Sequence, residues 1–207
     1  MQNTGESEDL RVRRTRKMLQ QALIDLTVEK GFNTITVRDI TERAMVNRST
    51  FYRHYLDKYD LLNQYMDEVY ELIANAPPTP PNPDPNAPEL PNGLMALLRH
   101  IQSFADFYRV MLGSKGDAVF IQRFRQNIEK RFRFLLANAG VKQDPNNAPI
   151  EMRLSFISCA DIGAILWWLE NDQPCSLAQL AIWLGKLSSA SAGFNLRPMG
   201  RDTQTQT

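Results

Sequence analysis

Four helix boundaries crowd between Gly31 and Asp57, and this spacing constrains the fold more than any other feature of the sequence. Gly31 suits the left-handed backbone that commonly ends a helix. Thr36, with Asp39 three residues later, has the pattern of a capping box. Asn47 and Asp57 are good N-cap residues. Helices as short as these caps allow are unstable alone, so they are expected to pack against one another and against a longer helix before Gly31.

The segment VNRSTFYRHY, residues 46–55, combines aromatic rings with many hydrogen-bond donors. Phe51 and Tyr55 lie four residues apart, so their side chains share one face of a helix and are expected to be buried. The polar side chains of the segment point elsewhere, namely those of Arg48, Ser49, Tyr52 and Arg53. The rings therefore anchor the helix, and the polar residues are available for recognition.

The spacing from Val37 to His54 fits a helix-turn-helix, in which two short helices are joined by a turn of a few residues. The charge distribution supports a polyanion partner for this part of the chain. Residues 11–60 contain eleven Lys and Arg against six Asp and Glu, a net charge of +5, whereas the remaining residues contain 13 and 17, a net charge of −4. A basic end on an acidic body predicts that only the N-terminal part contacts nucleic acid.

The segment APPTPPNPDPNAPELPN, residues 76–92, contains eight prolines. Proline removes a backbone donor and clashes with the preceding helical turn, so this density excludes a helix and predicts an extended connector. Recognition of the segment by a proline-binding partner is the alternative.

Apolar residues recur at helical spacing after this segment, which predicts helices over residues 94–112, 118–140, 150–171 and 176–193. No segment shows the period-two alternation of a strand with turn partners, so an all-α fold is predicted. The expected parts are a three-helix helix-turn-helix domain over residues 10–57, a connecting helix over 58–75, a proline-rich linker or loop over 76–92 and a helical bundle over 93–196.

The last two predicted helices are the most apolar and contain all three tryptophans. A helix that is apolar on nearly all sides is not an ordinary surface helix. Either the pair forms the centre of its domain or it forms a homodimer interface, and aromatic-rich, charge-poor faces favour the interface. Two-fold symmetry would also suit a protein that reads a palindrome. The residues expected at this interface are Ile162, Ile165, Leu169, Leu180, Trp183 and Leu187.

The stretch TITVRDITERAMVNRSTFYRHYLDKYDLL, residues 34–62, resembles the DNA-binding domain of the tetracycline-repressor (TetR) family of bacterial regulators. The matching positions occur in order and without gaps: Thr36, Ile40–Ala44, Val46, Thr50, Phe51, Tyr52, His54, Tyr55, Lys58, Leu61 and Leu62. Many family members have glycine where this chain has Met45. Such a turn often needs a positive φ, so either Met45 accepts the strain or the turn differs here.

The resemblance implies that Arg48 and Ser49 read base edges from the start of the recognition helix. Phosphate or sugar contacts are implied around them, and the full DNA-binding set is Thr36, Arg38, Arg48, Ser49, Thr50, Tyr52, Arg53, His54 and Lys58. Structural alternatives stay open for four of them: Thr36 as a helix cap alone, Thr50 and Tyr52 as packed residues, and His54 as a structural histidine. The basic run over residues 11–17 is either a phosphate clamp or minor-groove arm, or a solvated helix face.

The resemblance also implies a transcriptional regulator, expected to be a homodimeric repressor that binds a palindromic operator in double-stranded DNA and is released by a small-molecule effector. The candidate effector-binding residues are Phe104, Tyr108, Met111, Phe124 and Trp168. Their alternative role is ordinary core packing. The second hypothesis is a DNA-bound interaction factor or co-activator partner that has no ligand.

An enzyme is not expected, because the only histidines are His54 and His100 and the sequence lacks a Gly-rich phosphate loop and an HExxH motif. Cys159 and Cys175 have neither disulfide nor metal-ligand spacing, so no cofactor or metal is expected. The polar N-terminus has no signal-peptide pattern, and no apolar run approaches the roughly 18 residues of a membrane span. A cytoplasmic protein without a membrane contact is therefore expected.

Overall fold

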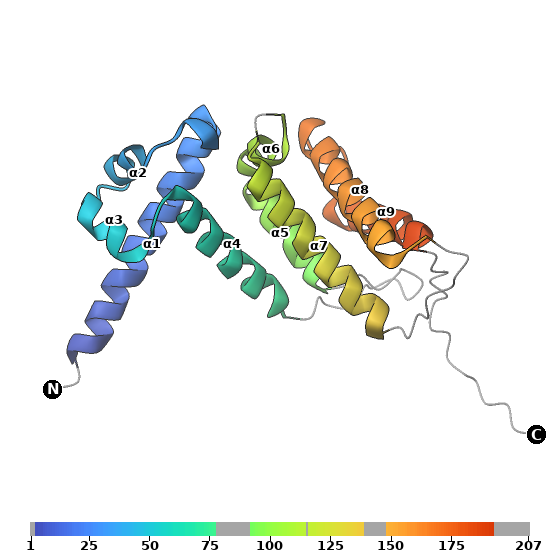
Figure 1. The fold of residues 1–207 in the computed structure, drawn as a ribbon, viewed down its shortest axis with the longest axis horizontal. Helices are drawn as coiled ribbons and strands as arrows, with labels where there is room; N and C mark the ends of the chain where they lie inside the picture. Colours follow the sequence, from blue (N-terminus) through green and yellow to red (C-terminus); the bar gives the residue numbers. More distant parts are fainter. Residues whose placement is uncertain (1–2, 78–91, 115, 139–147, 193–207) are drawn as a thin grey trace, which may run out of the picture. The chain divides into compact units, whose positions relative to one another are not determined.

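The computed structural model describes residues 3–77, 92–114, 116–138 and 148–192, and every regular element in these ranges is helical (Figure 1). The elements are α1 (Asn3–Lys30), a 3₁₀ turn η1 (Phe32–Thr34), α2 (Val37–Arg43), α3 (Arg48–His54), α4 (Lys58–Ala74), α5 (Asn92–Ser103), α6 (Ala105–Leu112), α7 (Ala118–Asn138), α8 (Ile150–Glu170) and α9 (Leu177–Ala192). The all-α prediction is therefore confirmed. Most of the proline-rich segment lies outside the described residues.

The chain forms two compact units, whose boundaries differ from those of the expected domains. The N-terminal unit comprises Met1–Ala76 together with Arg99–Ile121, and the C-terminal unit comprises Pro77–Leu98 and Gln122–Thr207. Residues 99–121 were expected in the C-terminal bundle. They pack with the N-terminal unit because their aromatic rings meet α4, as in the edge contact between Phe107 and Tyr65, with 6.3 Å between ring centroids.

The short helices of the N-terminal unit begin at the predicted caps. The Thr36 hydroxyl accepts a hydrogen bond from the Asp39 N–H, and the Asp39 carboxylate accepts one from the Thr36 N–H, which completes the capping box. Asn47 accepts from the Ser49 N–H at the start of α3, and Asp57 caps α4. Phe51 and Tyr55 are buried, at 0% and 2% exposure, as their spacing predicted.

The helices of residues 94–112 and of the N-terminus differ from their predicted extents. The predicted helix over 94–112 breaks at Phe104, whose φ of −124° and ψ of 38° are not helical, so α5 and α6 are separate elements. Helix α1 begins at Asn3, seven residues before the predicted start at Leu10. Apolar periodicity could not reveal that early turn, because the first residues of α1 are polar.

Met45 lies in the turn between α2 and α3 and has a φ of 52°, in the left-handed region. Of the two alternatives that the sequence left open, the strained one is therefore present. The Met45 side chain is 87% exposed, so no packing contact compensates for the backbone conformation.

Replacing Met45 by glycine should raise the free energy of unfolding by about 0.5–1 kcal/mol. Left-handed backbone penalises an L residue by roughly 1–2 kcal/mol, and the greater freedom of glycine in the unfolded chain removes part of the gain. Urea unfolding followed by circular dichroism measures the change. Met45→Ala is the matched control, because alanine keeps the strain, and an equal gain in both variants would contradict the backbone explanation.

The inner face of α8 is mostly apolar. It also carries two polar side chains, Ser158 and Asp161, and both are hydrogen-bonded to neighbouring helices. Trp168 and Leu169 are fully buried, whereas Ser158 donates to Glu129 of α7 at 3.0 Å. Asp161 accepts a hydrogen bond from the Ser188 hydroxyl of α9 at 2.8 Å. Among the described helices α8 alone is long and apolar enough to cross a membrane by length and composition. The expectation that no segment approaches a membrane span is therefore wrong for α8, in which polar residues interrupt the apolar run; 33% of this apolar stretch is buried.

Burial raises the pKa of Asp161 to about 6, although the Ser188 hydroxyl and Arg131 act in the opposite direction. Because the folded pKa lies above the unfolded value, stability falls as pH rises from about 4 to about 6. Asp161→Asn imitates the protonated carboxyl and should raise the free energy of unfolding by about 2–3 kcal/mol at pH 8, at 1.36 kcal/mol per pKa unit.

Tryptophan fluorescence during urea unfolding reports on this unit, which contains all three tryptophans. The gain from Asp161→Asn should vanish at pH 4. Glu170→Gln, a change at an exposed position of the same helix, should alter stability by less than about 0.5 kcal/mol at either pH. A pH-independent effect of Asp161→Asn would contradict the assignment.

Candidate nucleic-acid interface

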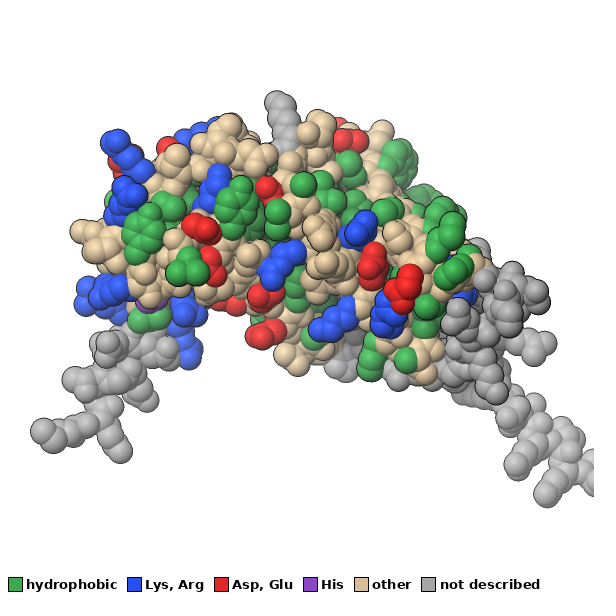
Figure 2. Space-filling model, in the orientation of Figure 1, with side chains coloured by type: hydrophobic (Ala, Val, Ile, Leu, Met, Phe, Trp, Pro, Cys, Tyr) green, Lys and Arg blue, Asp and Glu red, His purple; other side chains and the backbone are tan. Residues whose placement is uncertain are grey.

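The outer face of α3 is polar and basic, and Lys and Arg side chains gather over α2 and α3 in Figure 2. Arg48 lies on this face, donates a hydrogen bond to the Tyr52 hydroxyl at 3.2 Å and stacks over the Tyr52 ring at 5.5 Å. Tyr52 is 48% exposed, so it is not a core residue. Arg48 is exposed at the start of α3, so its guanidinium is accessible to a base edge in the major groove.

Four other predicted residues lie on α3, namely Ser49, Thr50, Arg53 and His54. The exposed Ser49 hydroxyl donates to the Asn47 side chain at 2.8 Å, and Arg53 donates to the half-buried Thr50 hydroxyl at 3.1 Å. Burial lowers the pKa of His54, as do the nearby charges of Arg16 and Arg53. His54 is therefore neutral at neutral pH in the free protein, and an approaching phosphate would raise its pKa again.

The predicted residues of α2 are exposed but already engaged in local contacts. The Thr36 hydroxyl belongs to the capping box, which fits its structural alternative as well as a phosphate contact. Arg38 forms an ion pair with Glu42 at 2.6 Å, and its side chain is 79% exposed. Such an exposed pair is worth less than about 1 kcal/mol, so Arg38 can exchange Glu42 for a phosphate at little cost.

Lys58 occupies a different environment from the one that the sequence predicted. Its ammonium group donates to three backbone carbonyls around η1, those of Phe32 at 2.9 Å, Asn33 at 3.1 Å and Ile35 at 2.8 Å. The same group lies 4.8 Å from the centre of the Phe32 ring. An ammonium has three N–H donors, and all three are used here. In this arrangement Lys58 fastens the start of α4 to the η1 loop and has no donor left for a phosphate.

Two ion pairs tie α1 to α2, and sequence reasoning did not single them out. Arg43 forms two hydrogen bonds with the Glu29 carboxylate, at 2.7 and 2.6 Å. Lys30 donates a hydrogen bond to Asp39 at 2.7 Å. This hydrogen bond, and secondarily those from Thr36, hold the pKa of the Asp39 carboxyl well below its usual range. Only spacing in three dimensions could reveal these pairs, because their partners lie nine and fourteen residues apart.

The candidate effector residues fall into both compact units. Phe104, Tyr108 and Met111 belong to the N-terminal unit, whereas Phe124 and Trp168 belong to the C-terminal unit. All except Phe104 are at most 1% exposed, and the Trp168 indole donates to the Cys175 carbonyl at 3.0 Å. These buried positions fit the alternative that the residues pack the two cores. Phe104 is half-buried and lines an open hollow.

The candidate dimer residues also divide into two groups. Trp183 and Leu187 are exposed on α9, at 42% and 64%. The other four are at most 9% exposed within one copy of the chain, namely Ile162, Ile165, Leu169 and Leu180. Side chains buried in their own unit cannot contact a partner, so these four residues stabilise the unit itself. The exposed apolar residues of α8 lie on its opposite face instead, at Met152, Phe156 and Trp167.

Within the described part of the chain, no three His, Cys, Asp or Glu side chains lie close enough to hold a metal ion. The surface around α3 carries hydrogen-bond donors and positive charge from Arg48 and Arg53. Such a surface suits a polyanion whose phosphates and base edges supply acceptors.

Comparisons with known proteins agree with this geometry. A model of the bacterial regulatory proteins of the tetR family matches residues 21–65, and a model of a transcriptional regulator C-terminal region from the same family matches residues 89–189. The uncharacterized HTH-type transcriptional regulator YxbF of Bacillus subtilis (strain 168) is 47% identical over 55 residues, which cover 26% of this chain and 14% of that relative. The chain thus spans a small part of this curated relative.

Solved structures resemble the fold over most of the chain. A TetR transcriptional regulator from Streptococcus agalactiae 2603V has a TM-score of 0.66 at 23% identity, with 89% of this chain and 99% of that chain covered. The regulator FadR from Bacillus subtilis, solved in complex with stearoyl-CoA, has a TM-score of 0.51 at 15% identity, with 84% and 98% covered. At these identities the likeness concerns the fold.

Proposed function

This chain belongs to the TetR family of bacterial transcriptional regulators, and on that premise we propose that it is a sequence-specific repressor which reads a palindromic operator with α3. The observation that carries the proposal is the outward Arg48–Tyr52 pair on the basic face of a helix-turn-helix. Arginine can contact O6 and N7 of guanine with two hydrogen bonds, which is the commonest specific base contact. We place the protein in the cytoplasm, where it meets DNA.

The proposed functional form is a homodimer, because a palindrome is read by two copies related by a two-fold axis. Its proposed interface is the outer face of α8, which we define by Met152, Phe156, Ala160, Gly163 and Trp167. All five residues are exposed and recur at helical spacing, and hydrophobic side chains gather over α8 in Figure 2. Gly163 has open space around its missing Cβ, so a partner helix can approach closely there.

The outer face of α9 extends this apolar surface with Trp183 and Leu187. Helix α9 packs against α8 in the same unit, so both helices are available to one partner. Aromatic residues and Met without charge are typical of interface cores.

Release from DNA by a small molecule is the regulatory part of the proposal. The fold relative FadR was solved with stearoyl-CoA, which supports an effector in this chain without identifying it. An effector changes DNA affinity only if it binds the DNA-free conformation more tightly than the DNA-bound one. A tenfold change in operator affinity requires about 1.4 kcal/mol of such coupling.

Arg48→Ala should weaken binding to the preferred operator about 10- to 100-fold, because a bidentate base contact discriminates by roughly 1–3 kcal/mol. Binding to unrelated duplex DNA should fall much less, since phosphate contacts dominate it. Fluorescence anisotropy with labelled duplexes measures both affinities. Arg99→Ala, at an exposed arginine of α5, is the control and should change neither. An equal loss on both DNAs would assign Arg48 to the phosphates instead.

A further inference from the structure

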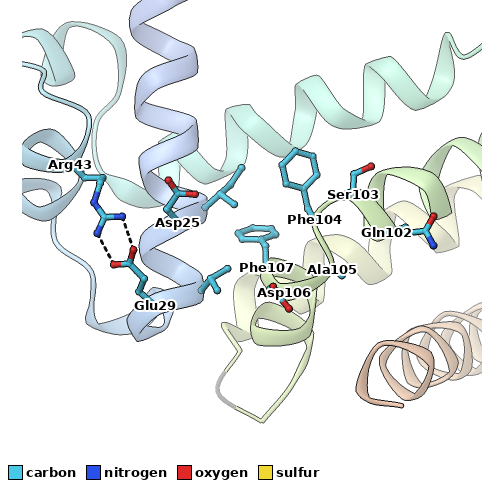
Figure 3. A pocket seen from close by; sticks show the side chains of 11 residues that line it. Asp25, Glu29, Arg43, Gln102, Ser103, Phe104, Ala105, Asp106 and Phe107 are labelled. Carbon is cyan, nitrogen blue, oxygen red and sulfur yellow. Dashed lines mark hydrogen bonds and ion pairs between the residues drawn. The ribbon is translucent and has the colours of Figure 1, made fainter. Parts of the chain in front are cut away.

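An open hollow of about 490 Å³ lies within the N-terminal unit, between α1 and the junction of α5 with α6 (Figure 3). Arg43 at the end of α2 completes its rim. Its volume is within the usual range of small-molecule sites. Neither the DNA-reading surface of α3 nor the proposed dimer face of α8 contributes residues to this hollow. Neither of those two roles therefore accounts for it.

In and beside the hollow three carboxylates stand against two guanidinium groups, and Arg43 interacts electrostatically with Asp25 as well as with Glu29. Glu29 is neutralised by Arg43, which it holds with two hydrogen bonds, and Asp106 is neutralised by Arg109 at 2.6 Å. Asp25 accepts a hydrogen bond only from the neutral Gln21 amide, at 2.8 Å, and forms no ion pair with any described residue. The hollow therefore carries a net charge of about −1 that a single positive group would balance.

The wall opposite Asp25 is mixed, with apolar Phe104, Ala105 and Phe107 beside polar Gln102, Ser103 and Asp106. Figure 3 shows Phe104 and Phe107 projecting from the α5–α6 side toward α1, from which Asp25 and Glu29 come. Ile24 on α1 adds to the apolar lining. Phe107 is 1% exposed, whereas Phe104 is half-buried and keeps part of its ring accessible. An aromatic face beside a carboxylate attracts a flat cation through ring stacking and through the cation–π interaction.

We propose that this hollow binds a small organic monocation with a flat aromatic body, such as an aryl amidinium or guanidinium. The planar positive head pairs with the Asp25 carboxylate, and the ring lies against Phe104. The neighbouring Glu29–Arg43 pair illustrates this recognition, because a planar cation meets a carboxylate there with two parallel hydrogen bonds.

A ligand bound in the hollow would change the affinity of the protein for DNA, a consequence that rests on the proposed function. The lining residues come from α1, from α2 of the helix-turn-helix and from the α5–α6 junction, so a bound ligand bridges the reading head and α6. A ligand that fits only one spacing of these elements favours that spacing. A planar cation can also compete with Arg43 for Glu29 and so release the end of α2 from α1.

Benzamidine is the test probe, and neutral benzamide is its matched control of the same shape. Benzamidine titrated into ¹⁵N-labelled full-length protein should shift the amide resonances around Asp25 and Phe104, with a millimolar dissociation constant typical of so small a ligand. Benzamide should bind at least tenfold more weakly. Asp25→Asn should raise the benzamidine dissociation constant about tenfold, and Phe104→Leu about threefold, whereas Glu71→Gln at an exposed position of α4 should leave it unchanged.

Equal binding of benzamide and benzamidine, unchanged binding by Asp25→Asn, or shifts confined to other residues would each overturn the site. These outcomes do not depend on DNA. A protein that fails to bind any duplex would overturn the proposed function, while the titration would still decide whether the hollow accepts an aromatic cation.

Discussion

Lys58→Met should lower the free energy of unfolding by about 2–3 kcal/mol in the absence of DNA. The substitution removes three hydrogen bonds from a charged donor to the carbonyls of Phe32, Asn33 and Ile35, and each charged hydrogen bond is worth roughly 1.5–3 kcal/mol before water replaces part of the loss. The cation–π contact with Phe32 adds about 0.5–1 kcal/mol. Methionine keeps the length of the apolar stem, so little packing is lost.

The free energy of unfolding is measured by urea denaturation of the free protein, with Lys17→Met as control. Lys17 is an exposed residue of α1, and its substitution should change stability by less than about 0.5 kcal/mol. The experiment separates two roles for Lys58. The alternative result is unchanged stability of the free protein, weaker DNA binding, and a slope of log affinity against log salt concentration that is smaller by about one. That result would show that Lys58 contacts a phosphate, as the sequence predicted.

Trp167→Glu should raise the dissociation constant of the dimer by at least about 100-fold and leave monomers at micromolar concentration. Trp167 is 49% exposed on the outer face of α8, and a two-fold interface contains every substituted residue twice. Two carboxylates would therefore be buried without partners, in addition to the loss of two aromatic side chains. Sedimentation velocity over a concentration series measures the dissociation constant.

Leu72→Glu is the control for this prediction, because Leu72 is 72% exposed on α4 and outside the proposed interface. It should leave the dimer intact. A Trp167→Glu protein that stays dimeric would place the interface elsewhere. A folded monomer should still bind a single half-site weakly, since α3 and its contacts do not depend on α8.

Much of the N-terminal unit could be predicted because its helix boundaries are encoded locally. Thr36, Asn47 and Asp57 cap the helices that their sequence positions suggested, and Phe51 with Tyr55 fills the core. These features depend on residues within four positions of each other. Local chemistry therefore sets the helix-turn-helix, with only the strained turn at Met45 left undecided by the sequence.

The environment of Lys58 could not be predicted, because its partners lie 23 to 26 residues earlier and are backbone carbonyls rather than side chains. The dimer residues show a second limit. A helix that is apolar all round, such as α8, has no periodicity that separates its inner face from its outer face. The sequence therefore could not distinguish Ile165, which is 2% exposed in the structure, from Trp167, which is 49% exposed.

The hollow beside Asp25 shows the same limit for a site. Its lining comes from segments about eighty residues apart in sequence, and no motif in either segment marks it. Phe104 was selected as a candidate effector residue for its aromatic ring, but the other four residues of that set are buried. Composition selects residue types, whereas only the fold determines which of them remain accessible.

Selection of bound duplexes from a random DNA pool by the purified full-length protein tests the central claim most directly. The account predicts enrichment of an inverted repeat, with half-sites centred one or more helical turns apart, and loss of that enrichment with Arg48→Ala. Binding without an enriched motif, or no binding at all, would contradict the assignment of α3 as a sequence-reading helix.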